Sequence, residues 1–299
     1  MRIGSRGSQL ARWQAEWVRD RLAAHGGGSA EIVVIKTRGD AEVDRPLHEL
    51  EGKGFFTKEI EAALLDGRID IAVHSLKDLQ TTLPPGLVLG AIPARHDPRE
   101  ALVNGKSLLD LAPGTRVGTS SLRRIAQLRF LRPDLEVVPL RGNVPTRVRK
   151  VETRDGLDAA LLAIAGLERL GLGGKGSAID PLDVMPAPGQ GALGIEIRAD
   201  DTATRKALQP LHDASSAGAI TAERALLAAL GGGCQAPVAA WVGMRDARSG
   251  MRLYGRVTET DGAVQLTASA EIDAKRPEAA GDAVARLLEG EGAASLLAR

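Results

Sequence analysis

The sequence predicts an α/β protein that ends in a small α+β unit. Three observations indicate this fold class. Short apolar runs alternate with amphipathic stretches over roughly the first 170 residues, a pattern typical of mainly parallel sheets covered by helices. Proline-rich segments at residues 93–99 and 181–188 interrupt this alternation and indicate two points at which the chain crosses between units. After residue 238, three consecutive strand-like runs precede one helix.

The first unit begins with a strand around Ile3 and a helix at residues 10–22, whose apolar residues share one face. Further strands are expected at 31–36, 70–74 and 87–92, with a second helix at 55–65. The apolar face of the first helix consists of Leu10, Trp13, Trp17, Val18 and Leu22.

The second unit repeats the alternation. Its expected strands lie near Val117 and at residues 135–140 and 159–162, and its expected helices lie at 121–131, at 144–151 and just before Leu170. Gly171, Gly173 and Gly176 have the spacing of a dinucleotide fingerprint, but they follow a helix instead of a strand. We therefore interpret them as a loop that terminates the helix.

The third unit is the α+β part of the chain. A helix is expected at residues 221–230, strands at 238–244, 251–258 and 264–272, and a closing helix at 277–288. The two crossing points and this change of character predict three domains: residues 1–94 together with 189–212, residues 95–188, and residues 213–299.

The composition argues against several classes of protein. A net charge of +1 and an aromatic content of 2% are poorly suited to holding nucleic acid, and no apolar run reaches membrane-spanning length. The single cysteine allows no intrachain disulfide, and the five histidines lack metal-ligand spacing, so no metal site is expected. The N-terminal residues form no apolar leader, so a cytoplasmic protein is expected.

Polar residues follow the expected strand at 70–74. Ser75, Lys77 and Asp78 lie just after it, at the carboxyl edge where open α/β sheets bind ligands. A simple turn, with a local ion pair between Lys77 and Asp78, would explain the same residues.

A second polar cluster follows the strand near Val117. Ser120 or Ser121, which follow Thr119, can cap the next helix, and Arg123 and Arg124 occupy its first turn. Ordinary capping explains the hydroxyls, but two cations at a helix N-terminus oppose the helix dipole unless an anion offsets them. Arg141 and Arg147 repeat the theme after the next strand, and arginines pair bidentately with carboxylates. The sequence therefore favours a site for a ligand that carries several carboxylates.

The only cysteine, Cys234, follows three glycines between an expected helix and an expected strand. A lone cysteine is often a small buried apolar residue. The glycines instead allow a tight bend that would leave the sulfur approachable, so a covalent attachment point is equally consistent with the sequence.

Taken together, these motifs resemble the porphobilinogen deaminase family, whose members are also called hydroxymethylbilane synthases. The resemblance covers nearly the whole chain in order. The segments that carry it are residues 2–6, 13–14, 52–59, 70–78, 117–124, 140–144, 187–192 and 232–237.

The resemblance implies two domains like those of type II periplasmic binding proteins, plus a small α+β domain with a three-stranded antiparallel sheet. It also implies a monomeric transferase of haem biosynthesis. Such an enzyme joins four porphobilinogen units head to tail, with loss of ammonia, to give linear hydroxymethylbilane. The chain is built on a dipyrromethane cofactor, which is held through a thioether to the cysteine that matches Cys234.

The resemblance also assigns site residues. Asp78 matches the catalytic aspartate, which assists ammonia loss and stabilises the positive charge that develops during coupling. The positions that match cofactor-binding and carboxylate-binding residues are Arg6, Ser75, Lys77, Thr119, Ser121, Arg123, Arg124, Arg141, Arg147 and Gln190. The alternative function is a non-catalytic polycarboxylate-binding protein, which would leave Cys234 as a free thiol and Asp78 dispensable.

Overall fold

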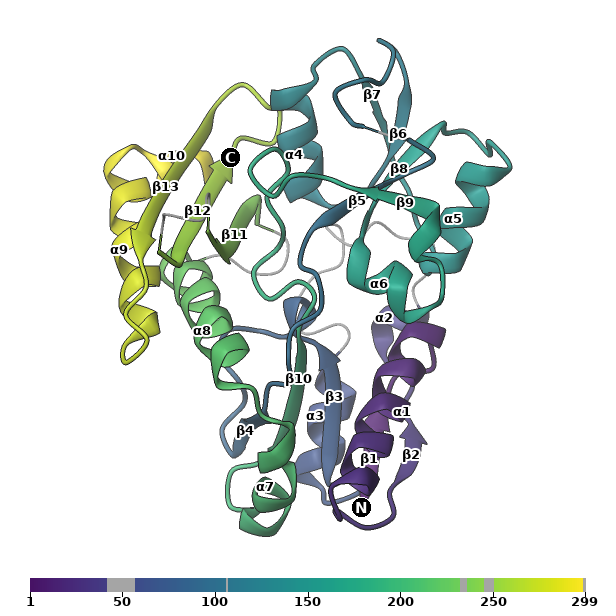
Figure 1. Cartoon of the computed structure of the whole chain (residues 1–299), viewed down its shortest axis with the longest axis vertical. Helices are drawn as coiled ribbons and strands as arrows, with labels where there is room; N and C mark the ends of the chain where they lie inside the picture. The colour runs from purple at the N-terminus through teal and green to yellow at the C-terminus, as the bar shows by residue number, and fades with distance from the viewer. Residues whose placement is uncertain (42–56, 106, 232–235, 245–249, 298–299) are drawn as a thin grey trace.

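The computed structural model describes residues 1–41, 57–105, 107–231, 236–244 and 250–297. These residues form three β-sheets with helices packed against them (Figure 1). The first sheet and its helices occupy the lower half of the view, the second sheet the upper half, and the third sheet lies beside them.

The first sheet has the strand order β2-β1-β3-β10-β4. Strand β1 pairs in parallel with β2 and β3, whereas β10 is antiparallel to both β3 and β4. The strands are β1 (Arg2–Ser5), β2 (Glu31–Val34), β3 (Ile71–Ser75), β4 (Leu87–Ala91) and β10 (Leu193–Arg198), and the accompanying helices are α1 (Gln9–Ala24), α2 (Arg38–Ala41), α3 (Lys58–Leu65) and α7 (Thr202–Leu208). Helix α1 packs Ala15, Val18 and Leu22 against this sheet, as its apolar face predicts.

The second sheet has the same plan, with the order β7-β6-β8-β5-β9. Strand β6 pairs in parallel with β7 and β8, and β5 is antiparallel to β8 and β9. The strands are β5 (Glu100–Val103), β6 (Arg116–Gly118), β7 (Glu136–Val138), β8 (Ala159–Ala163) and β9 (Gly176–Ala178), and the helices are α4 (Leu122–Leu131), α5 (Val144–Glu152) and α6 (Ile164–Arg169).

Each of these two sheets therefore has one antiparallel strand inserted beside a parallel series. Strand β5 directly follows the first crossing segment, and β10 directly follows the second. After the first crossing β5 becomes an inner strand of the second sheet, and after the second crossing β10 becomes an inner strand of the first sheet. The two units are therefore connected through the interiors of their sheets.

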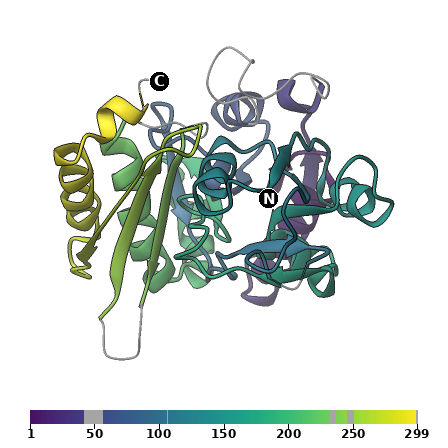
Figure 2. The same cartoon turned by 90° about the horizontal axis from the view of Figure 1, so that it is seen from above.

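The third sheet consists of β11 (Val238–Gly243), β12 (Arg252–Thr258) and β13 (Gln265–Glu271), all antiparallel. One face of this sheet packs on α8 (Ala214–Ala229) and α9 (Pro277–Gly290) through Val238, Leu253 and Val257. Residues of the opposite face, Ala239 and Tyr254, pack against Met185 of the second crossing segment. The view from above shows this sheet as a separate element with α9 beside it (Figure 2). Helix α10 (Ala293–Leu297) follows α9.

The predicted fold class is confirmed: two α/β units with two crossing segments precede a small α+β unit with a three-stranded antiparallel sheet. The loop interpretation of Gly171, Gly173 and Gly176 was incomplete, because β9 starts at Gly176 after a short 3-10 turn. The three domain boundaries stay a prediction. Among the described residues, no helix has both the length and the apolar character that a membrane span requires.

Candidate active site

The end of β3 positions Ser75, Lys77 and Asp78. After Ser75 the chain makes one 3-10 turn, Leu76–Asp78, and Leu76 is fully buried in the core. That anchor fixes the two polar residues beside it. Ser75 Oγ accepts a hydrogen bond of 2.8 Å from Gln14 Nε2 on α1.

A cavity of about 80 Å³ opens beside this turn. Asp78, Ser75 and His74 line it from β3 and its extension, and Arg6 lines it from the junction of β1 and α1. Three residues that the sequence predicted separately, Arg6, Ser75 and Asp78, therefore surround one space. Its full lining is Arg6, Ser8, Leu10, Ala11, Gln14, Thr57, Val73, His74, Ser75 and Asp78.

The start of α4 carries the second predicted cluster. Thr119 Oγ1 accepts a hydrogen bond of 3.3 Å from the Ser121 backbone N–H, and Ser121 is the N-cap residue, although its side chain makes no capping hydrogen bond. The neighbouring Ser120 hydroxyl instead exchanges hydrogen bonds with the backbone of Leu140, which joins the ends of the two strand connections.

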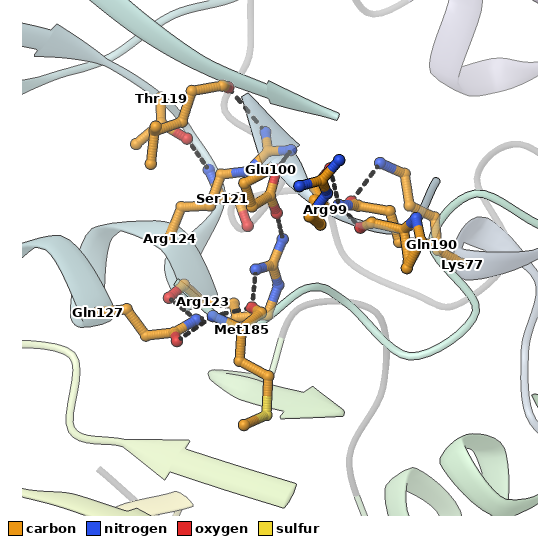
Figure 3. A network of polar contacts seen from close by, with 12 residues as sticks. Lys77, Arg99, Glu100, Thr119, Ser121, Arg123, Arg124, Gln127, Met185 and Gln190 are labelled. Carbon is orange, nitrogen blue, oxygen red and sulfur yellow. Dashed lines mark hydrogen bonds and ion pairs between the residues drawn. The ribbon is translucent and has the colours of Figure 1, made fainter. Parts of the chain in front are cut away.

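Arg123 and Arg124 both grip a single buried carboxylate, Glu100, at the start of β5 (Figure 3). Arg123 Nη2 lies 2.6 Å from Glu100 Oε1, and Arg124 Nη2 lies 2.6 Å from Glu100 Oε2. Arg123 also donates to the Met185 carbonyl and Arg124 to the Leu161 carbonyl. The two cations that oppose the α4 dipole are thus offset by a carboxylate of the protein itself.

Burial alone would raise the pKa of Glu100, but Arg124 and Arg123 lower it to about 2. The carboxylate is therefore ionised at neutral pH, although it is 0% exposed. Glu100 was not predicted as a site residue from the sequence. Its only signal is a glutamate at the head of an apolar run, directly after the first crossing segment.

Helix α5 positions Arg147. Its N-cap residue Asn143 accepts a hydrogen bond of 2.9 Å from the Thr146 N–H, and Arg147 Nε donates to the Gly142 carbonyl at 2.7 Å. Burial, with repulsion from Arg124 and Arg141, lowers the pKa of Arg147 to about 10, and Asp78 partly opposes this shift. These interactions bring the ends of β3, β6 and β7 to one place.

Lys77 connects this basic cluster to the second crossing segment. Its Nζ donates to Gln190 Oε1 at 3.1 Å, and Gln190 Nε2 donates to the Pro98 carbonyl at 2.8 Å (Figure 3). Burial and repulsion from Arg124 lower the pKa of Lys77 to about 8, while Asp78 and Glu100 raise it. Gln190 therefore holds Lys77 against the backbone that leads into Glu100.

The cluster contains more positive than negative charge. Among the described residues, the carboxylates that act on Lys77, Arg123, Arg124 and Arg147 are Asp78 and Glu100. The Arg124 Nε–H is also a buried donor with no acceptor among the described residues. Such a donor is stabilised when an oxygen of a ligand or water accepts its hydrogen bond.

The structure thus collects most of the predicted residues, although it does not test their roles. One network of interactions contains Lys77, Asp78, Arg123, Arg124, Arg147 and Gln190, and Arg141 lies beside Arg147. The cavity at Asp78 is flanked by Arg6 and Ser75. Thr119 and Ser121 lie at the first turn of α4. Cys234 lies outside the described residues.

Comparisons with known proteins agree over the whole chain. Residues 1–206 match the family model described as porphobilinogen deaminase, dipyromethane cofactor binding domain, and residues 217–290 match the porphobilinogen deaminase C-terminal domain. The chain is 49% identical to a porphobilinogen deaminase of Syntrophotalea carbinolica, covering 100% of this chain and 95% of that protein. It is 50% identical to the one of Moorella thermoacetica, covering 99% and 95%.

Among solved structures, a putative methionine-binding lipoprotein from Bacillus subtilis matches 72% of this chain and 91% of that chain, with 16% identity and a TM-score of 0.42. The two family models together span both α/β units and the third sheet. The chain therefore belongs to the porphobilinogen deaminase family.

Proposed function

We propose that this chain joins four porphobilinogen units head to tail, with loss of ammonia, to give linear hydroxymethylbilane. Family membership supports the reaction. The assignment of residues rests on one observation: the cations Lys77, Arg124 and Arg147 cluster around one carboxylate, Asp78. Each pyrrole of such a chain bears an acetate and a propionate, so a growing product needs many cationic partners and few anionic ones.

The described residues fit a dipyrromethane cofactor. The cluster has excess positive charge, and Arg124 has a buried N–H with no acceptor among the described residues, so carboxylates of a bound dipyrrole would stabilise both. When bound, the cofactor supplies the pyrrole carbon at which the chain grows. We assign its attachment to Cys234 through a thioether, because Cys234 matches the attachment cysteine of the family and is the only cysteine of the sequence.

The residues divide the work by charge. Cationic and polar side chains bind and orient the carboxylates of the pyrroles. The cations are Arg6, Lys77, Arg123, Arg124, Arg141 and Arg147, and the polar groups are the hydroxyls of Ser75, Thr119 and Ser121 and the amide of Gln190. Asp78 lies at the cavity and bears the opposite charge. Its carboxylate can accept a pyrrole N–H and stabilise the positive charge that develops on the substrate as ammonia leaves.

The proposal extends to a cytoplasmic protein that works as a monomer, without nucleic acid or membrane as a partner. A thioether needs a reduced cysteine before attachment, which a reducing compartment maintains. Light scattering after size-exclusion chromatography tests the monomer directly, and a stable dimer would contradict it.

Intact mass spectrometry of the purified protein tests the covalent attachment. We expect an excess over the chain mass equal to two deaminated porphobilinogen units in the wild type, and no excess in Cys234→Ala, whose fold should be retained because no disulfide is lost. Circular dichroism of the variant checks the fold. A wild-type chain that keeps its bare mass after incubation with porphobilinogen would exclude the proposal and favour a non-catalytic polycarboxylate-binding protein.

A further inference from the structure

Glu100 is a charged residue of the site that belongs to neither group of assigned residues. It is fully buried, and its two oxygens are each 2.6 Å from a different guanidinium group. Both arginines come from the first turn of α4, whereas Glu100 begins β5, directly after the first crossing segment. The carboxylate therefore fixes the α4 N-terminus to the centre of the second sheet.

The two guanidinium groups are constrained on their other sides as well. Arg123 Nη1 donates to the Met185 carbonyl, and Arg124 Nη1 donates to the Leu161 carbonyl at 3.0 Å. Two anchors for each planar group leave it little rotational freedom. Arg124 is 5% exposed, and with its Nη atoms held in this way its Nε–H remains as the donor with no acceptor among the described residues.

Glu100 also acts electrostatically on Lys77. The charged groups around the Lys77 ammonium are Asp78 and Glu100, which favour its protonated form, and Arg123 and Arg124, which oppose it. Gln190 accepts the Lys77 hydrogen bond and donates to the carbonyl of Pro98, two residues before Glu100. The same carboxylate thus influences the orientation of two arginines and the charge of a lysine.

We propose that Glu100 is a positioning residue for the reaction: it holds Arg123 and Arg124 in the orientation in which Arg124 receives a carboxylate of the pyrrole chain. The inference rests on the proposed function of this site. It predicts that the charge and the length of the side chain at position 100 have separable effects.

Glu100→Gln removes the charge, and Glu100→Asp keeps the charge but shortens the reach so that both arginines cannot be held at once. We expect kcat/KM for porphobilinogen to fall about tenfold to a hundredfold in both variants, the size associated with losing one charge-assisted hydrogen bond to the ligand. Asp70→Asn is the control, because Asp70 pairs with Arg2 just before β3 begins, at the opposite end of that strand from Lys77.

The pH profile separates positioning from a merely structural role. Lys77 loses its proton as the pH rises through about 8. Removal of the negative charge of Glu100 lowers the pKa of Lys77 further, so the alkaline limb of kcat/KM moves to lower pH in Glu100→Gln. It should stay near the wild-type position in Glu100→Asp and in Asp70→Asn.

A readout without turnover comes from nuclear magnetic resonance of arginine-labelled and lysine-labelled protein. The doubly anchored guanidinium groups should give resolved Nη–H signals in the wild type, and these should merge in Glu100→Asp as rotation is freed. Lys77 should titrate at lower pH in Glu100→Gln.

Wild-type kcat/KM and an unmoved alkaline limb in a folded Glu100→Gln protein would overturn the inference. If that variant does not fold, unchanged kcat/KM in Glu100→Asp with merged arginine signals would overturn it equally. Either result, obtained with a wild type that carries the covalent mass and turns over, concerns Glu100 alone; a wild type with neither would refute the proposed function instead.

Discussion

Asp78 and Glu100 are two carboxylates of one basic cluster, and their surroundings differ. Glu100 is 0% exposed and each of its oxygens is held by a guanidinium group, so its bonding capacity is directed into the protein. Asp78 follows the end of β3 and lines the cavity, where a ligand can reach it. Burial and pairing therefore suit Glu100 to a positioning role. Its place at the cavity suits Asp78 to contact with the substrate.

At Asp78, replacement by asparagine keeps the shape of the side chain and removes its charge. We expect Asp78→Asn to retain the covalent mass and to lose about a hundredfold to ten-thousandfold in kcat, as when a positioned charged group is removed from the chemical step. Steady-state kinetics with mass spectrometry of the same sample measures both. Asp70→Asn should keep wild-type kcat, and normal turnover of Asp78→Asn would exclude its catalytic assignment.

The sequence was informative about these residues where polar side chains followed a recognisable strand or began a helix. Lys77, Asp78, Arg123 and Arg124 were predicted on that basis. Glu100 was missed because its partners lie 23 and 24 positions further along, and nothing local distinguishes a buried glutamate from an exposed one. Pairing between distant segments is a property of the fold.

At the scale of elements, α4 connects the site to the third sheet. Gln127 lies one turn after Arg123 and exchanges hydrogen bonds with the Met185 backbone, accepting from its N–H at 2.8 Å and donating to its carbonyl at 3.0 Å. Arg256 on β12 donates to Gln127 Oε1 at 2.9 Å and to the carbonyls of Leu182 and Asp183. The sheet that precedes the closing helix is thereby fixed to the helix that carries the two arginines.

Arg256 should therefore contribute far more to stability than a surface arginine of the same strand. We expect Arg256→Ala to reduce the free energy of unfolding by about 2–4 kcal/mol, because it removes a buried hydrogen bond to Gln127 and leaves the part-buried carbonyls of Leu182 and Asp183 without this donor. Arg252→Ala, which loses an exposed pair with Glu271 and long hydrogen bonds of 3.4 Å to Ser269, should lower it by less than about 1 kcal/mol. Urea denaturation measures both, and equal losses would contradict the proposed link.

Most helices and parallel strands of the α/β units followed from apolar periodicity, but β5, β9 and β10 did not. Strand β5 begins with Glu100, and β9 is the three-residue segment Gly-Ser-Ala, so neither has a recognisable β pattern. Strand β10 follows a proline- and glycine-rich segment and pairs with β3, more than a hundred residues earlier. These strands are defined by the partners that the crossings bring to them.

At the scale of the whole molecule, the first crossing segment lies against the residues that directly follow the second. The His96 N–H donates to the Gly191 carbonyl at 3.2 Å, and Arg169 of the second unit donates to the same carbonyl at 2.7 Å while its guanidinium lies over Trp13 of α1. Arg95 pairs with Glu223 of α8 through two bonds of 2.7 and 2.9 Å. All three sheets are therefore connected through one small region.

Gly191 has a φ of +85°, and a Cβ there would lie 2.5 Å from the His96 carbonyl oxygen. Gly171 has a φ of +70° with open space around it, so it serves as a matched control. We expect Gly171→Ala to reduce the free energy of unfolding by about 1–2 kcal/mol from backbone strain alone. Gly191→Ala should cost at least about twice as much, because the first crossing segment must also move away from residue 191. Denaturant titration compares them, and equal costs would show that the two are not in tight contact.

The insertion of β10 between β3 and β4 has a consequence for how the protein is made. As the nascent chain leaves the ribosome, β1 to β4 emerge first, but their sheet has a gap until residues 193–198 have been synthesised. The second sheet needs nothing beyond Ala178, so it can close earlier even though translation reaches it later. The part of the molecule that is synthesised first can then be completed second, and the end of β3 with Lys77 and Asp78 lacks its β10 neighbour until well after the arginines of α4 have been synthesised.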